Sequence, residues 1–256
     1  MLLERAAIWY NGKKGRERLR MGQNNHGSEP GKKEIPCFAG NLRSHMINVP
    51  QCLRKASGIR IFGRRIKSLA FTTDVAIIRN INTDAIIAVY PFTPQPAITK
   101  AIMMAADMPV FVGVGGGVTK GERVVDLARD AEFMGAFGVV LNAPTGNETI
   151  ERLKNMLDIP VVITVVSEHT DISGRIAAGA DIINISGAGR TAQIVRSIRD
   201  KYPDIPLIAT GGPTEESIER TIEAGANAIT YTPPTNGELF AISMRRYREE
   251  AEQKKE

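Results

Sequence analysis

Short apolar runs alternate with amphipathic segments along most of the chain. The runs are rich in β-branched residues and apolar throughout, without polar residues at every second position. This pattern is typical of strands that are buried on both faces, as in parallel sheets. Eight runs are predicted as strands, at residues 66–73, 85–90, 110–115, 138–142, 161–166, 181–186, 207–210 and 228–232. The run at 59–62 competes with 66–73 for the place of the first strand, and a lead-in at 37–58 is available to plug the barrel bottom.

A two-part repeat marks where these strands begin. Three runs follow Asp-x-Pro, at 107–109, 158–160 and 204–206, and three follow Gly-Ala, at 135–136, 179–180 and 225–226. Proline ends a helix and tolerates the first strand position, whereas glycine past a helix takes the left-handed conformation that ends it. The two kinds alternate strictly, so each recurs at about the span of two βα units. Eight such units favour an α/β fold that closes as a (β/α)8 TIM barrel over an open doubly wound sheet.

A basic N-terminal arm precedes the predicted barrel. Residues 1–36 hold eight Lys and Arg against four Glu, and so carry most of the formal net charge of +5. Because this stretch is also rich in Gly and Asn and buries little apolar surface, we expect a poorly ordered arm at 1–36 and the barrel at 37–256. A translation start at Met21 or Met46 is the alternative. The arm lacks the interleaved aromatic residues of single-strand binders, so we do not expect nucleic-acid binding.

The composition predicts a cytoplasmic globular protein. Hydrophobic residues make up 43% and charged residues 24%, which is ordinary for a protein with a buried core. No apolar run approaches the roughly 20 residues of a membrane span, and Glu4 and Arg5 interrupt any signal-peptide core. Two cysteines, Cys37 and Cys52, are too few for a disulfide framework, which favours a reduced compartment. Apolar residues at 101–107 offer a surface for a homo-oligomer, or belong to the core.

Glycines gather after the late strands. In such barrels the loops after the strands build the active site, and phosphate commonly binds after strands seven and eight. Glycine lets backbone N–H groups approach an anion, and a helix N-terminus adds favourable partial charge. The predicted phosphate-binding residues are Gly187, Gly189, Arg190, Gly211, Gly212, Asn236 and Gly237. The alternative is that these glycines only form tight turns.

The closing quarter of the chain carries a family resemblance. The run LIATGG at 207–212, the EAGA at 223–226 and the last apolar strand resemble phosphate-binding (ribulose-phosphate-type) TIM barrels. That superfamily includes aldolases, epimerases, thiazole synthase and tryptophan-pathway barrels, and the chain is also similar to bacterial hydrolase-like barrels. The resemblance implies a phosphorylated ligand. The chain departs from it at Tyr231-Thr-Pro-Pro234, where proline donates no N–H, so Asn236 and Gly237 would have to complete the cradle.

Three polar residues at strand ends are the predicted catalytic residues. Glu168, beside His169, follows strand five, where a carboxylate at a partly dry rim suits acid–base chemistry. Asn142 ends an apolar strand, and a buried amide must be hydrogen-bonded, so it orients a ligand or satisfies the loop backbone. Asp74 lies at the predicted mouth. The alternatives are a surface position for Glu168 and a helix N-cap for Asp74.

The sequence requires no cofactor. No cluster of His and carboxylates predicts a resident metal ion, although Mg²⁺ carried by a substrate is compatible with the chain. The triple glycine at 115–117 permits close approach of a flat ligand such as FMN, or forms a flexible loop before a capping box at Thr119–Glu122. The strand interiors contain no lysine, which disfavours Schiff-base chemistry.

Three functional hypotheses follow. The first is an enzyme that acts on a small phosphorylated metabolite by lyase, isomerase or hydrolase chemistry. The second is an FMN-binding oxidoreductase barrel. The third is a non-catalytic, phosphate-sensing regulatory barrel that contacts RNA or protein through the basic arm.

Overall fold

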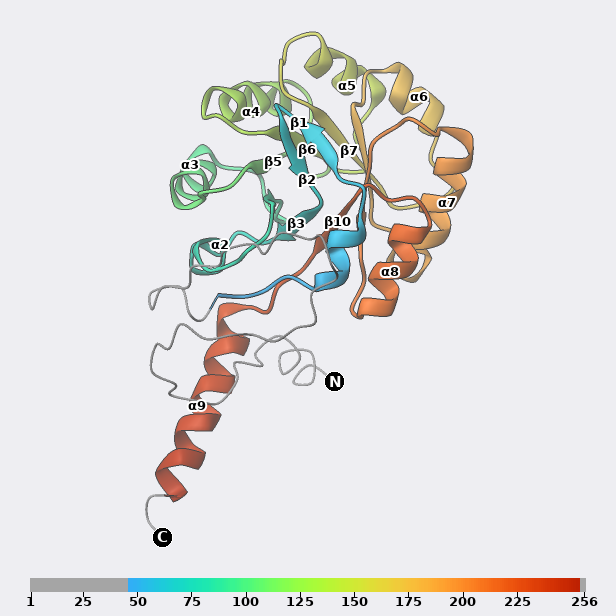
Figure 1. Ribbon diagram of the computed structural model, residues 1–256. Coiled ribbons are helices and arrows are strands. Elements are labelled where there is room, and N and C mark those ends of the chain that lie inside the picture. The colour runs from blue at the N-terminus through green and yellow to red at the C-terminus, as the bar shows by residue number, and fades with distance from the viewer. Residues whose placement is uncertain (1–45, 254–256) are drawn as a thin grey trace.

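The computed structural model describes residues 46–253, which form a closed parallel barrel surrounded by helices (Figure 1). The eight barrel strands are β3 (Ser68–Phe71), β4 (Ala85–Ala88), β5 (Val110–Gly115), β6 (Gly138–Leu141), β7 (Val161–Val165), β8 (Ile182–Ile185), β9 (Leu207–Thr210) and β10 (Ala228–Tyr231). They pair in chain order, and β10 closes the barrel against β3. The predicted (β/α)8 fold and all eight predicted strand positions are thus confirmed. The predicted arm at 1–36 lies outside the described residues.

Helices follow the strands and cover the outside of the barrel. They are α2 (Val75–Arg79), α3 (Pro96–Ala105), α4 (Glu122–Phe133), α5 (Asn147–Lys154), α6 (Ile172–Ala177), the short η3 (Ala188–Arg190), α7 (Thr191–Lys201), α8 (Glu215–Glu223) and α9 (Asn236–Gln253). Thr214 caps α8 through Ser217. The capping box predicted at Thr119 is wrong, because α4 begins at Glu122 with Gly121 as its N-cap and without a side-chain hydrogen bond.

A β-hairpin closes the bottom of the barrel. It consists of β1 (Ile59–Ile61) and β2 (Arg64–Ile66), which pair antiparallel. Its isoleucines pack into the barrel interior against Leu69, Phe111 and other inward-facing strand residues. The competing run at 59–62 is therefore a strand, but one of this plug. The lead-in predicted as the plug instead contributes η2 (Gln51–Lys55), which packs beside α8 (Figure 1).

The last helix, α9, departs from the barrel. It points away from the strands in Figure 1, and none of its residues is fully buried. Its first turn is fixed by Thr235 and Glu238, whose side chains bond reciprocally to each other's backbone N–H. No helix within residues 46–253 is long and apolar enough to cross a membrane.

The hairpin plug predicts a clear stability effect. Ile66 is 3% exposed, so Ile66→Ala should lower the free energy of unfolding by about 2–4 kcal/mol through lost burial and a residual cavity. Arg64→Ala, at an exposed position of the same strand, should change it by less than about 0.5 kcal/mol. Urea denaturation monitored by circular dichroism measures both values. Equal effects of the two variants would show that the hairpin does not plug the core.

Candidate active site

Two adjoining hollows open at the mouth of the barrel, where the strands end. The larger, of about 660 Å³, is lined by Phe71, Thr72, Thr73, Asp74, Ile77, Val89, Tyr90, Pro91, Asn142, Thr232, Pro233, Pro234 and Thr235. The smaller, of about 230 Å³, is lined by Val89, Tyr90, Pro91, Phe92, Pro94, Gly113, Gly115, Gly117, Val118, Thr119 and Asn142. Both lie over the loops that follow the strands, as predicted for the working face. They share four residues, so a ligand can span them.

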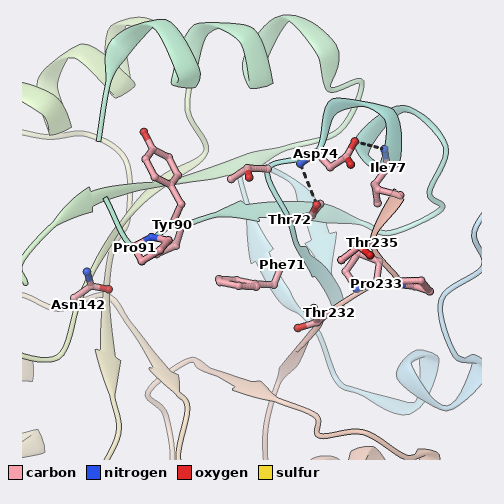
Figure 2. Close-up of a pocket in the computed structure, with 13 residues that line it drawn as sticks. Phe71, Thr72, Asp74, Ile77, Tyr90, Pro91, Asn142, Thr232, Pro233 and Thr235 are labelled. Carbon is pink, nitrogen blue, oxygen red and sulfur yellow. Dashed lines mark hydrogen bonds between the residues drawn. The ribbon is translucent and has the colours of Figure 1, made fainter. Parts of the chain in front are cut away.

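Asn142 lies at the junction of the two hollows. Its backbone is fixed, because its N–H donates to Gly115 O at 2.9 Å and its carbonyl accepts from Thr145 N at 3.1 Å. Its side chain lines both hollows, and Figure 2 shows it across the larger hollow from Thr232 and Thr235, with the Phe71 ring between them. The amide group thus lies where it can orient a ligand by donating and accepting hydrogen bonds.

Asp74 also lines the larger hollow, but its carboxylate is engaged as the N-cap of α2. Oδ1 accepts from Ala76 N at 2.8 Å. It also accepts from Ile77 N at 3.2 Å, a bond shown in Figure 2. The capping alternative is therefore what the structure shows. A catalytic role for Asp74 would have to use its other oxygen.

Glu168 and Arg190 form an ion pair across two rim loops. Their side chains meet at 3.1 Å, which joins the loop after β7 to η3 after β8. His169 Nε2 lies 3.8 Å from the same carboxylate. Neither Glu168 nor Arg190 lines the two hollows described above. The structure therefore brings the predicted acid–base group together with a predicted phosphate ligand, but not with Asn142 and Asp74.

Two of the predicted phosphate-binding glycines already donate their backbone N–H groups to hydrogen bonds within the protein. Gly187 N donates to Thr191 Oγ1 at 3.0 Å, and Gly211 N donates to Thr230 O at 3.0 Å. A Cβ on Gly211 would lie 2.7 Å from side-chain atoms of Ile218 and Ile229, so this glycine is needed for packing. The phosphate-binding prediction then depends on Gly189, Arg190, Gly212, Asn236 and Gly237.

The sequence did not reveal that Phe71 belongs to the apolar wall of the site. Phe71 is 40% exposed at the end of β3, and Tyr90, Pro91 and Pro233 complete the wall. Thr119, assigned to a helix cap from the sequence, is instead 6% exposed beside the smaller hollow. An aromatic residue near the end of an apolar run was the available signal, because such a residue can extend from the barrel into the mouth.

The described part of the chain holds no cluster of metal-ligating side chains. Within residues 46–253 no three His, Cys, Asp or Glu side chains come together as ligands. Mg²⁺ sites in proteins commonly use only one or two carboxylates together with water and substrate phosphates.

Comparisons with known proteins agree on the fold. Phosphoenolpyruvate phosphomutase from Streptomyces platensis subsp. rosaceus has a TM-score of 0.53 at 16% identity, over 71% of this chain and 80% of that one. Phosphonopyruvate hydrolase in complex with oxalate and Mg²⁺ gives 0.53 at 14% identity, over 72% and 80%. A mandelate oxidase gives 0.54 at 16% identity, over 69% and 68%. The fold is a (β/α)8 TIM barrel.

One curated sequence supplies a further, partial likeness. An isopentenyl-diphosphate delta-isomerase from Vibrio campbellii (strain ATCC BAA-1116) is 30% identical over 32% of this chain and 34% of its own length. The match thus spans about a third of the length of this curated relative. No family model matches the chain.

Proposed function

We propose that this TIM barrel is an enzyme that acts on a small phosphorylated metabolite at its mouth, by lyase, isomerase or hydrolase chemistry. The observation that carries the proposal is the hollow of about 660 Å³ over the strand ends. Its size lies within the roughly 300–1,000 Å³ of small-molecule sites, and this end of a TIM barrel is where active sites lie. The names of the phosphomutase and the diphosphate isomerase, which denote phosphorus-containing substrates, support the same ligand class.

The ligand would lie with its carbon skeleton against the apolar wall and its phosphate toward the late loops. Thr235 closes one side of the larger hollow, and α9 begins at the next residue, Asn236. The Thr235 N–H is already bonded to Glu238 at 2.7 Å, so the amides of Asn236 and Gly237 are the remaining donors of this turn. They would provide the N–H groups that Pro233 and Pro234 cannot.

Arg190 would supply the positive charge. No Lys, Arg or His lines either described hollow, so a phosphate needs a cation from the rim. The Arg190 side chain is 59% exposed, and the Glu168 carboxylate is its ion-pair partner and would compete with a phosphate for it. When a phosphate binds to Arg190, Glu168 loses its ion-pair partner. The Glu168 carboxylate can then accept a proton from the ligand, while Asn142 orients the reacting group.

Two variants with opposite effects test these roles. Arg190→Met should weaken the binding of inorganic phosphate by about 10–100-fold, since a charge-assisted hydrogen bond contributes about 1.5–3 kcal/mol. Glu168→Gln should strengthen phosphate binding several-fold, because the competing carboxylate is gone. Isothermal titration calorimetry measures both, with Arg196→Met on the following helix, α7, as the control. Weaker phosphate binding in Glu168→Gln would contradict the competition.

The ligand class itself is tested by thermal shift. The wild-type protein should be stabilised by inorganic phosphate and by some members of a panel of sugar phosphates and short-chain phosphates, by mass action. The corresponding unphosphorylated compounds should give smaller shifts. A panel without any response up to millimolar concentration would contradict the proposed function.

An FMN-binding oxidoreductase is the second candidate, favoured by the smaller hollow. Its lining includes three glycines, Gly113, Gly115 and Gly117, which permit close approach of a flat ring to the backbone. The aromatic residues Tyr90 and Phe92 line it as well. FMN would supply redox chemistry, and these residues would hold the ring by stacking and close backbone contact. A colourless purified protein whose absorbance and thermal stability do not change with added FMN would remove this candidate.

A further inference from the structure

The inward-facing side chains of the barrel form layers. In each strand alternate residues face inward, and Val162, Ile182, Ile208 and Ala228 belong to the interior cluster that also holds the hairpin plug. The residues two positions further on, Thr164, Asn184, Thr210 and Thr230, therefore face the lumen as well, nearer the mouth. The strand registers place Asn184 and Thr230 in one layer with Ile87 and Val140. Thr164 and Thr210 share the next layer, toward the mouth, with Phe71 and Gly113.

The lumen below the mouth is therefore divided into an apolar and a polar half. The four polar side chains all come from β7–β10, whereas β3–β6 contribute Phe71, Ile87, Gly113 and Val140. The polar half continues into the loops after β8 and β9, which carry Arg190 and Gly212. Such a division suits a ligand with one apolar side and one hydrogen-bonding side.

Two atoms of the polar half are buried without a hydrogen-bond partner. Asn184 and Thr230 are 8% and 6% exposed. Asn184 donates through Nδ2 to Thr164 Oγ1 at 3.3 Å, but its Oδ1 and the Thr230 Oγ1 have no partner among residues 46–253. Buried polar atoms in native proteins are nearly always hydrogen-bonded, and an unmet one destabilises the fold. An apolar side chain at either position would avoid that cost.

We propose that Asn184 and Thr230 form a subsite for a hydroxyl group of the ligand. Asn184 Oδ1 can only accept, so the ligand group must donate, and the Thr230 hydroxyl can donate back to the ligand oxygen. A hydroxyl meets both demands at once. It would enter from the mouth past Thr164 and Thr210, which form the next layer and whose side chains are part-exposed. The subsite rests on the proposed function for the phosphate end of the ligand, and adds that the substrate is a hydroxylated phosphate compound.

The first test needs no ligand. Thr230→Val keeps the side-chain shape and removes the unmet hydroxyl, so it should raise the melting temperature of the free protein by about 2–4 °C. Thr210→Val is the matched control. It removes a part-exposed hydroxyl that water can reach, and should give no increase. A lower melting temperature for Thr230→Val would show that this hydroxyl serves the fold, and would overturn the subsite.

The second test uses two phosphates that differ in hydroxyl groups. In the wild-type protein glycerol 3-phosphate should bind at least about 10-fold more tightly than propyl phosphate, and in Thr230→Val this ratio should fall toward 1. Equal binding of both by the wild type would overturn the subsite and leave the proposed function intact. If neither compound nor inorganic phosphate binds, the proposed function fails, and so does a subsite for a hydroxylated phosphate.

Discussion

Gly116→Ala is expected to lower the free energy of unfolding by about 3 kcal/mol or more, because strain and overpacking act together. Gly116 has φ of +94°, which alanine rarely adopts. An added Cβ would also overlap Thr145 Oγ1 and lie 3.1 Å from Asn142 N, so the loop would have to move. The same movement would displace Asn142, and phosphate-dependent stabilisation should fall with it. Urea denaturation gives the first quantity and thermal shift the second.

Gly121→Ala separates strain from overpacking. Gly121 also has positive φ, at +62°, but no atom lies within 4 Å of the position that an added Cβ would take. Gly121 combines this φ with ψ of −143°, a region that residues with a Cβ scarcely populate. Gly121→Ala should therefore cost about 1–3 kcal/mol, from backbone strain alone. Adding Thr145→Ala to Gly116→Ala removes the nearest atom and should recover part of the loss. Equal costs for Gly116→Ala and Gly121→Ala would show that the close packing of the glycine loop against Thr145 does not hold in solution.

Arg199→Met is expected to lower the free energy of unfolding by about 3 kcal/mol, since hydrogen bonds from a charged donor contribute about 1.5–3 kcal/mol and several are lost together. The Arg199 guanidinium donates to Gly225 O at 3.0 Å, to Asn227 Oδ1 at 2.7 Å and to Ile205 O at 2.9 Å. It thereby ties the end of α7 to the turns that lead into β9 and β10. Methionine keeps much of the apolar stem while removing every donor.

The matched control for Arg199 lies one turn earlier on α7. Arg196 is exposed and donates to Glu223 O at 2.6 Å, so Arg196→Met should cost less than about 1 kcal/mol. Urea denaturation of both variants measures the difference. A loss for Arg199→Met no larger than that for Arg196→Met would contradict a structural role for this network.

The strands could be predicted from the sequence because the residues that mark the start of each strand act locally. Asp-x-Pro and Gly-Ala each act through backbone geometry at one point, and positive φ at Gly135, Gly179 and Gly225 is what the Gly-Ala junctions require. Asn142 was recognised because a polar residue at the end of an apolar strand is unusual. Asp74 was placed correctly at the mouth, and its capping bonds are also local.

The shape of the site could not be predicted, because it depends on segments far apart in the chain. The larger hollow joins residues after β3 and β4 with residues after β10, and no local pattern reports that these meet. Likewise, Gly211 is a glycine because Ile218 and Ile229 pack against it. The ion pair between Glu168 and Arg190 could not be predicted without the distance between the two loops that carry them. The unmet atoms of Asn184 and Thr230 became apparent only with the barrel interior in view.

A crystal structure of the wild-type protein soaked in tungstate, a phosphate mimic with a strong anomalous signal, tests the proposed ligand site most directly. We expect one anion at the mouth, in contact with the Arg190 guanidinium and with backbone amides of Gly212 or Gly237. The Glu168 carboxylate should have moved away from Arg190. An anion found only at the opposite end of the barrel, beside Arg60 and Lys154, or none at all, would contradict phosphate binding at the mouth.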